Sequence, residues 1–251
     1  MSGVNVIATG ASTIAMDLND VWNRVLGGQP SPQWELVLIA GAVALLAVLP
    51  WRVWRITRNV VTIAHEGGHA LVAVLTGRRL TGIQLHSDTS GLTLTKGRPR
   101  GPGMVLTAAA GYVTPSLLGL GVAALLGAGK ITLLLWVTIV LLAAMLVMIR
   151  NAFGVLSVLV TGGIVFAVSW YAPSNIQAVF GYVFAWFLLL GGVRPVFELQ
   201  RKRWRGRAPD SDADQLAKIT GVAGGLWVTL FALVSIASLV IGSTLLLPAL
   251  P

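Results

Sequence analysis

The sequence predicts an all-α polytopic membrane protein with about six or seven transmembrane helices and one small β-hairpin. Composition predicts the class, because 55% of the 251 residues are hydrophobic and only 11% are charged, whereas about 25% of the residues of an average soluble protein are charged. Length supports it, because several apolar runs approach or exceed the roughly 20 residues that cross a bilayer as a helix. We expect residues 1–251 to form a single integral membrane domain.

The absence of cysteine restricts the possible metal ligands, and the distribution of the net charge of +9 indicates the binding partner. Without cysteine there is no disulfide and no thiolate metal site, so any metal must be held by His and carboxylate side chains. The basic residues stand in short loops beside apolar runs, which is typical of membrane topology and of contact with anionic lipids. We therefore expect the lipid bilayer as a partner, no nucleic acid, and a location in the plasma membrane. The oligomeric state stays open.

The elements follow in chain order. Residues 1–33 are predicted to form an N-terminal tail, in which 12–26 either lies on the membrane surface or is disordered. A basic start and a small-residue cleavage site are missing, so we expect no signal peptide. Apart from the helix 58–76, the predicted spans are 35–54, 102–127, 131–149, 152–170, 176–193 and 219–246. Aromatic and basic residues at the end of the first span mark a membrane interface: Trp51, Arg52, Trp54 and Arg55.

The predicted helix 58–76 contains an HExxH motif, His65-Glu66-Gly67-Gly68-His69. His65 and His69 are about one helical turn apart, so both imidazoles can reach one ion. Glu66 can hold a carboxylate beside water bound to that ion, which is the arrangement of zinc hydrolases. The motif is specific, because the chain has only three His and three Glu and an ionisable group at membrane depth costs about 2.5–3.5 kcal/mol.

Several other features allow two interpretations each. Gly67 and Gly68 serve either close helix packing or room for a substrate backbone beside the metal. Pro115 either kinks a packed span or breaks a helix that lines the catalytic cavity. Arg150 and Asn151 form either an interfacial turn or, if buried, a substrate-binding group, and we take them as candidate substrate-binding residues.

Residues 82–95 alternate apolar and polar side chains around a Ser-Asp-Thr-Ser-Gly turn, which predicts a β-hairpin. Ile83 and Leu85 are the apolar positions of one arm, and Leu92 and Leu94 those of the other. An open strand edge beside a hydrolytic site could pair with an extended peptide. His86 lies in the turn, where we expect it to be solvated.

Two His ligands need at least one more protein ligand, normally His, Asp or Glu. Half of the six Asp residues, Asp210, Asp212 and Asp214, stand in the basic stretch 194–218, which is expected to be a loop before the last span. They can alternatively mark a helix N-terminus, where acidic residues and Ser caps are favoured. The remaining candidates are Asp17, Asp20, Glu35, His86, Asp88 and Glu198.

Taken together, these motifs resemble the site-2 protease family of intramembrane zinc metallopeptidases, in particular its peptidase-like branch. The resemblance covers roughly residues 58–230 and rests on HEGGH, the hairpin, Gly111-Tyr112-x-x-Pro115, Arg150-Asn151 and Ser211-Asp212-Ala213. It implies that His65 and His69 bind Zn²⁺, that Glu66 is the base, and that the third ligand is Asp212 or, as second choice, Asp214. The chain lacks the Asn-Pro-x-Pro-x-Leu-Asp-Gly pattern that carries the distal Asp in better-known members.

The basic residues raise a topological conflict. With seven spans, the positive-inside rule places the N-terminus inside, His65 nearer the outer end of its helix and Asp212 at the inner edge. A metal bond of about 2 Å cannot join groups so far apart. We therefore expect one segment among 102–193 to cross only partly, with residues 161–163 or Arg150-Asn151 as the break and the N-terminus outside. The alternatives are that the 194–218 region folds back into the membrane, or that Asp212 is not a ligand.

The sequence thus predicts an intramembrane zinc metalloprotease, a metalloendopeptidase that cleaves membrane-anchored proteins with metal-activated water and Glu66 as general base. One alternative is a zinc-binding membrane scaffold or regulator without turnover. Replacing Glu66 by Gln separates these two, because it should abolish turnover and spare metal binding. The other alternative is an ion-coupled transporter, for which internal repeats would be expected and none is convincing.

Overall fold

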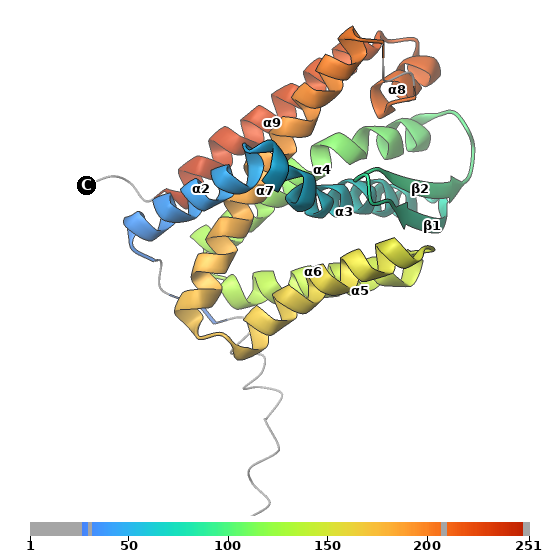
Figure 1. Ribbon diagram of the computed structural model, residues 1–251. Helices are drawn as coiled ribbons and strands as arrows, with labels where there is room; N and C mark the ends of the chain where they lie inside the picture. The colour runs from blue at the N-terminus through green and yellow to red at the C-terminus, as the bar shows by residue number, and fades with distance from the viewer. Residues whose placement is uncertain (1–26, 30–31, 207–209, 248–251) are drawn as a thin grey trace, which may run out of the picture.

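The computed structural model describes residues 27–29, 32–206 and 210–247. The predicted segment 12–26 and most of the N-terminal tail lie outside the described residues. The described elements, labelled in Figure 1, are α2 (Trp34–Val48), α3 (Trp51–Leu75), β1 (Arg79–Leu85), β2 (Gly91–Lys96), α4 (Pro102–Gly127), α5 (Ile131–Met148), α6 (Ala152–Tyr171), α7 (Ser174–Trp204), α8 (Asp212–Thr220) and α9 (Gly224–Leu246).

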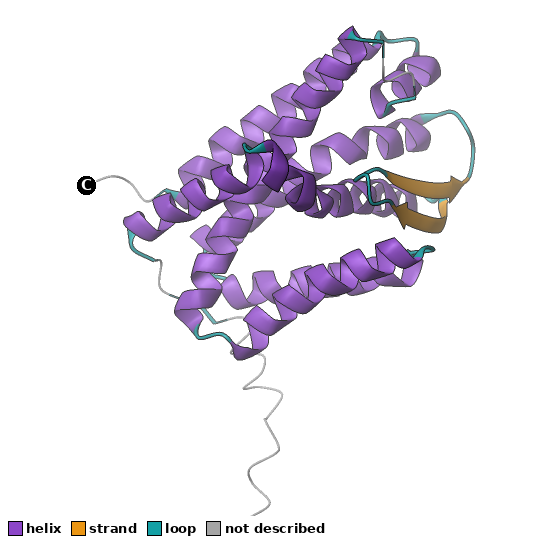
Figure 2. Ribbon diagram, in the orientation of Figure 1, coloured by secondary structure: helices purple, strands orange, loops and turns teal. Residues whose placement is uncertain are grey.

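Five described helices are long and apolar enough to cross a membrane, namely α4, α5, α6, α7 and α9. Helices α2 and α3 add one more span at most, because they form a pair bent by 102°. The remaining described elements are the short helix α8 and one two-stranded hairpin beside α3 (Figure 2). The prediction of an all-α polytopic membrane protein with a small hairpin is therefore confirmed, with five or six spans.

The prediction of a first span over 35–54 is wrong, because α2 ends at Val48 and a new helix begins after Pro50. Proline has no N–H to donate and its ring clashes with the preceding turn, so a helix cannot continue through it without a kink or break. The freed carbonyls of Val48 and Leu49 accept hydrogen bonds from the Arg194 guanidinium on α7. The break is thus stabilised by a second helix.

The predicted partial crossing within 102–193 is also wrong. Helix α4 runs unbroken through Pro115, which is buried, so the interpretation of Pro115 as a helix break is not supported. Helix α6 is continuous through residues 161–163, and Arg150-Asn151 is the turn between two helices of full length. Among the described residues, the bent candidate is the α2–α3 pair instead, which forms one crossing at most.

Strands β1 and β2 pair antiparallel, with Ile83 opposite Thr93. The far edge of β1 is occupied by the α5–α6 turn: Arg150 N–H donates to the Ile83 carbonyl at 2.9 Å. The Asn151 side chain both accepts from Leu85 N–H and donates to the Leu85 carbonyl. The hairpin is therefore held between α3 and the α5–α6 turn, with β2 on the opposite edge.

The basic residues gather at one end of the bundle. Because consecutive spans alternate in direction, the turns 76–101, 149–151 and 205–223 share this end, which we name the basic end (Figure 1). The α2–α3 corner lies beside the last third of α7, since Arg194 donates to Val48 and Leu49 and Arg58 pairs at 3.4 Å with Glu198. Among the described turns at the opposite end, Lys130 is the only basic residue. The first half of the predicted basic loop 194–218 is helical, because α7 continues to Trp204.

Candidate metal centre

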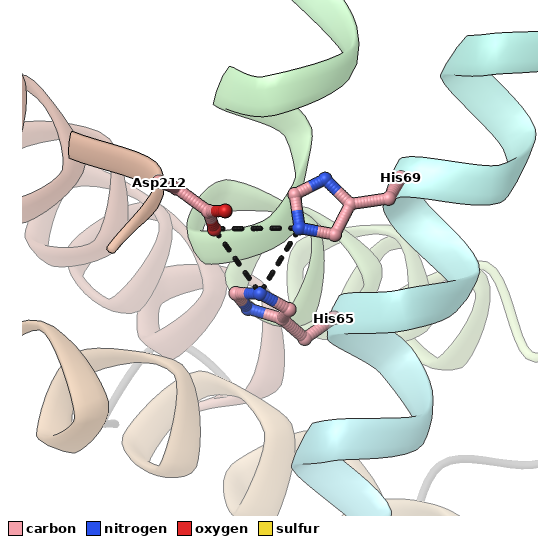
Figure 3. A group of neighbouring side chains, drawn as sticks. All are labelled: His65, His69 and Asp212. Carbon is pink, nitrogen blue, oxygen red and sulfur yellow. Dashed lines mark hydrogen bonds and ion pairs between the residues drawn. The ribbon is translucent and has the colours of Figure 1, made fainter. Parts of the chain in front are cut away.

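Three side chains converge near the basic end (Figure 3). His65 and His69 project from one face of α3, and their Nε2 atoms lie 3.1 Å apart. Asp212, at the start of α8, directs Oδ2 to 3.2 Å from His65 Nε2 and 3.3 Å from His69 Nε2. The three potential ligand atoms lie within 4.8 Å of one another, so a single ion could contact all three.

Asp212 reaches this position because of how α8 begins. Ser211 is the N-cap residue, and its hydroxyl donates to the Asp214 carboxylate at 2.6 Å. The other oxygen of Asp214 accepts from Arg203, the penultimate residue of α7. Ala213 and Leu216 are fully buried and anchor α8 in the core between α4, α7 and α9. Asp214 therefore turns away from the His pair, and Asp212 faces it.

The site has room and chemistry for a metal ion. Oδ2 of Asp212 is buried, and it lies at ion-pair distance from the two imidazole nitrogens. A Cβ at Gly111 on α4 would lie 2.4 Å from His69 Nε2 and 2.5 Å from His65 Nε2, so only glycine leaves this space open. Nδ1 of His69 contacts the Thr107 carbonyl at 2.7 Å, an arrangement that leaves Nε2 free to bind a metal. Two imidazoles and one carboxylate are a donor set that suits zinc.

The pKa values of both carboxyl groups at the start of α8 are lowered. Burial by itself raises the pKa of the Asp212 carboxyl, but the two facing imidazoles offset this and hold the pKa below its usual range. The pKa of Asp214 is likewise low, because the hydrogen bonds from Ser211 and Arg203 outweigh its partial burial. The low pKa of Asp214 fits its place in the first turn of α8, where a negative charge is favoured.

Glu66 lies beside the His pair and is buried, with 4% of its surface exposed. Its Oε2 accepts a hydrogen bond of 2.6 Å from the Thr93 hydroxyl on β2. Gly91 on the same strand comes so close that a Cβ there would lie 2.4 Å from Oε1. The carboxylate is therefore held between α3 and the hairpin.

A cavity of about 420 Å³ opens onto the three ligand atoms and Glu66. Helices α3, α4, α7 and α8, strand β2 and the hairpin turn contribute to its wall, including Thr62, Ser90, Thr93, Tyr112 and Gln215. Tyr112 lies edge-on to the His65 ring, with centroids 4.8 Å apart, and stacks on Phe231. We name this space the site cavity.

Several other candidates lie elsewhere. Arg150 and Asn151 do not line the site cavity; Arg150 donates to the carbonyls of Val147 and Ile149, and Asn151 pairs with β1. His86 and Asp88 stand at the exposed hairpin tip, where the hydroxyl and N–H of Ser90 lower the pKa of Asp88.

Glu198 lies at the α2–α3 corner, and Glu35 lies in the first turn of α2. Asp17 and Asp20 lie outside the described residues.

Of the two glycines of the motif, Gly68 is required for the packing of α3 against α4. A Cβ at Gly68 would lie 2.1 Å from the Thr114 hydroxyl, so this glycine lets α3 and α4 approach closely. Gly67 meets only the Met145 sulfur, at 3.9 Å, and does not border the ligand atoms.

Sequence reasoning did not assign roles to Thr93 and Gly111. Thr93 was marked only by its place in the alternation of the predicted hairpin, and Gly111 only by the Gly-Tyr-x-x-Pro pattern. Their contacts depend on how the hairpin and α4 cross α3, which a local pattern does not encode.

Comparison with known proteins identifies the family. Searches of curated proteins and of solved structures found no significant match. A family model described as Peptidase M50B-like matches residues 38–242, a range that includes α3 to α8, the hairpin, all three converging side chains and most of α2 and α9. Since this match covers well over half of the chain, the protein belongs to the Peptidase M50B-like family, within the site-2 protease group of membrane peptidases.

Proposed function

We propose that this multi-pass membrane protein is an intramembrane zinc metalloprotease that cleaves membrane-anchored proteins. The observation that carries the proposal is the convergence of His65, His69 and Asp212 from two distant segments onto one point beside a buried glutamate. A purely structural cluster would not need the space that Gly111 leaves open between the two imidazoles. In this proposal the three residues hold the zinc ion.

Glu66 is the general base and acid in this proposal. Zinc, when bound, would activate a water molecule and polarise the scissile carbonyl. Glu66 would take a proton from that water and later donate it to the leaving amine, so one carboxylate serves both steps. Its burial supports the role, because a carboxylate shielded from bulk water meets few competing partners.

The substrate, in this proposal, lies extended along β2. The far edge of β1 is occupied by Ile149 and Asn151, whereas no strand pairs with the outer edge of β2 among the described residues. Strand β2 also borders the site cavity, so a peptide added there would pass the ligand atoms. Arg150 and Asn151 would then serve substrate binding indirectly, by holding the sheet.

The orientation proposed here follows from charge. The basic end carries nearly all described Lys and Arg residues of the turns, and the positive-inside rule assigns such an end to the cytoplasm. The site cavity would open there, within one membrane domain that includes the whole chain. The plasma membrane is the location that we propose.

The test is cleavage of a membrane-anchored peptide by the reconstituted protein, comparing the wild type with Glu66→Gln. The wild type should cleave and retain zinc, and Glu66→Gln should retain zinc but lose cleavage by a factor of about 100 or more. A zinc-loaded wild type that does not cleave would replace the protease proposal by the zinc-binding scaffold.

A further inference from the structure

Thr93 gives Glu66 its only hydrogen bond from a side chain in the described part of the chain. Its hydroxyl donates to Oε2 at 2.6 Å, and no hydrogen bond among the described residues engages Oε1. A buried carboxylate can rotate about its side-chain bonds unless a partner fixes it. The Thr93 hydroxyl therefore selects one orientation of the carboxylate and one of its two oxygens.

The position of Thr93 is itself fixed by the sheet. Thr93 stands opposite Ile83, which is 1% exposed and packs with α5 and α6 side chains. Side chains on β2 alternate, so Gly91 and Thr93 turn toward α3 while Leu92 and Leu94 are 47% and 41% exposed. A shift of β2 by one residue would replace Thr93 by leucine at Glu66. The hydrogen bond thus depends on the register of β2.

We infer that Thr93 is a positioning residue that orients the base Glu66 and links this orientation to the strand on which the substrate is proposed to pair. The inference rests on the proposed function. A peptide that adds to the outer edge of β2 restrains its backbone, and therefore restrains Thr93 and Glu66 together. Substrate binding then contributes to ordering the base.

The test uses the full-length protein reconstituted with zinc and a membrane-anchored peptide substrate. Thr93→Val removes the hydroxyl but keeps a β-branched side chain of nearly the same size. We expect kcat to fall about 10- to 100-fold, as for a misplaced catalytic group, with KM changed less than about threefold and zinc content unchanged. Thr93→Ser restores the hydroxyl and should recover kcat to within about threefold of the wild type.

Two controls separate positioning from other roles. Thr81→Val makes the same substitution on β1, where the hydroxyl donates to the Leu94 carbonyl and borders no part of the site cavity, and its kcat should equal that of the wild type. In a Glu66→Gln background, Thr93→Val should leave the affinity for the substrate peptide unchanged, because the hydroxyl acts on the base.

Three results would overturn the inference: wild-type kcat in Thr93→Val, loss of zinc from Thr93→Val, or a loss of peptide affinity as large as the loss of kcat. A wild-type protein that binds zinc but cleaves nothing would overturn the proposed function first, before any variant at Thr93 is compared.

Discussion

At the scale of single residues, the candidate centre depends on its glycines as well as on its ligands. Gly111 leaves the space between the two imidazoles, and Gly91 lets β2 approach the Glu66 carboxylate. The one-turn spacing of His65 and His69 predicted that their side chains meet, and their Nε2 atoms are 3.1 Å apart. The requirement for Gly111 could not be predicted in this way, because it arises where α4 crosses α3.

Gly111→Ala tests this dependence. The added methyl group would lie within 2.4–2.5 Å of both Nε2 atoms, so zinc affinity should fall by about 10- to 100-fold. Alanine favours a helix more than glycine does, so α4 itself should not be weakened. Zinc affinity is measured by competition with a chelator.

Gly121→Ala on the same helix is the control, because no atom lies within 4 Å of a Cβ there. It should bind zinc as the wild type does. Equal zinc affinity of Gly111→Ala and Gly121→Ala would show that the ion does not occupy the space beside Gly111.

At the scale of elements, hydropathy predicted most helices and missed the bend. The spans α4, α5, α6, α7 and α9 and the hairpin follow from apolar length and alternation, both of which are local. The α2–α3 break depends on Pro50 together with Arg194, which is 144 positions away in the chain. Arg194 and Arg58 also lie over the ring of the fully buried Trp54, whose Nε1 donates to Glu198. Hydropathy averaged over neighbouring residues cannot predict contacts between residues so far apart in the chain.

Arg194→Met should destabilise this corner. Methionine keeps much of the side-chain volume but leaves the carbonyls of Val48 and Leu49 without their donor. We expect a loss of about 1.5–3 kcal/mol in stability, as for hydrogen bonds made by a charged group. The measurement is the thermal unfolding midpoint in detergent.

Arg201→Met is the comparison, because Arg201 is exposed near the end of α7. It should leave the midpoint close to the wild-type value. A midpoint for Arg194→Met as high as for Arg201→Met would mean that Pro50 alone maintains the bend.

At the scale of the whole molecule, the bent pair removes the conflict between charge and metal binding. Counting seven full spans places His65 nearer the outer end of its helix and Asp212 at the inner edge. In the structure Arg58 contacts Glu198 in the last third of α7, so the basic clusters and all three converging side chains lie in the same half of the bundle. A count of apolar runs could not predict this arrangement, because it treats each run as a complete membrane crossing.

Cysteine labelling tests the orientation, since the chain has no cysteine of its own. Lys96→Cys lies at the basic end and Ser174→Cys at the opposite end, and both positions are exposed. In intact cells a membrane-impermeant thiol reagent should label Ser174→Cys only, and should label Lys96→Cys only after lysis. The reverse pattern would place the site cavity outside the cytoplasm.

The most direct measurement is the zinc content of purified protein for the wild type, Asp212→Ala and Asp214→Ala. We predict about one zinc ion per chain in the wild type and none in Asp212→Ala, because that variant removes one of three protein ligands. Asp214→Ala should keep zinc with weaker affinity, since Asp214 faces Ser211 and Arg203. A metal-free wild type, or full zinc content in Asp212→Ala, would contradict the assignment of His65, His69 and Asp212 as the zinc site.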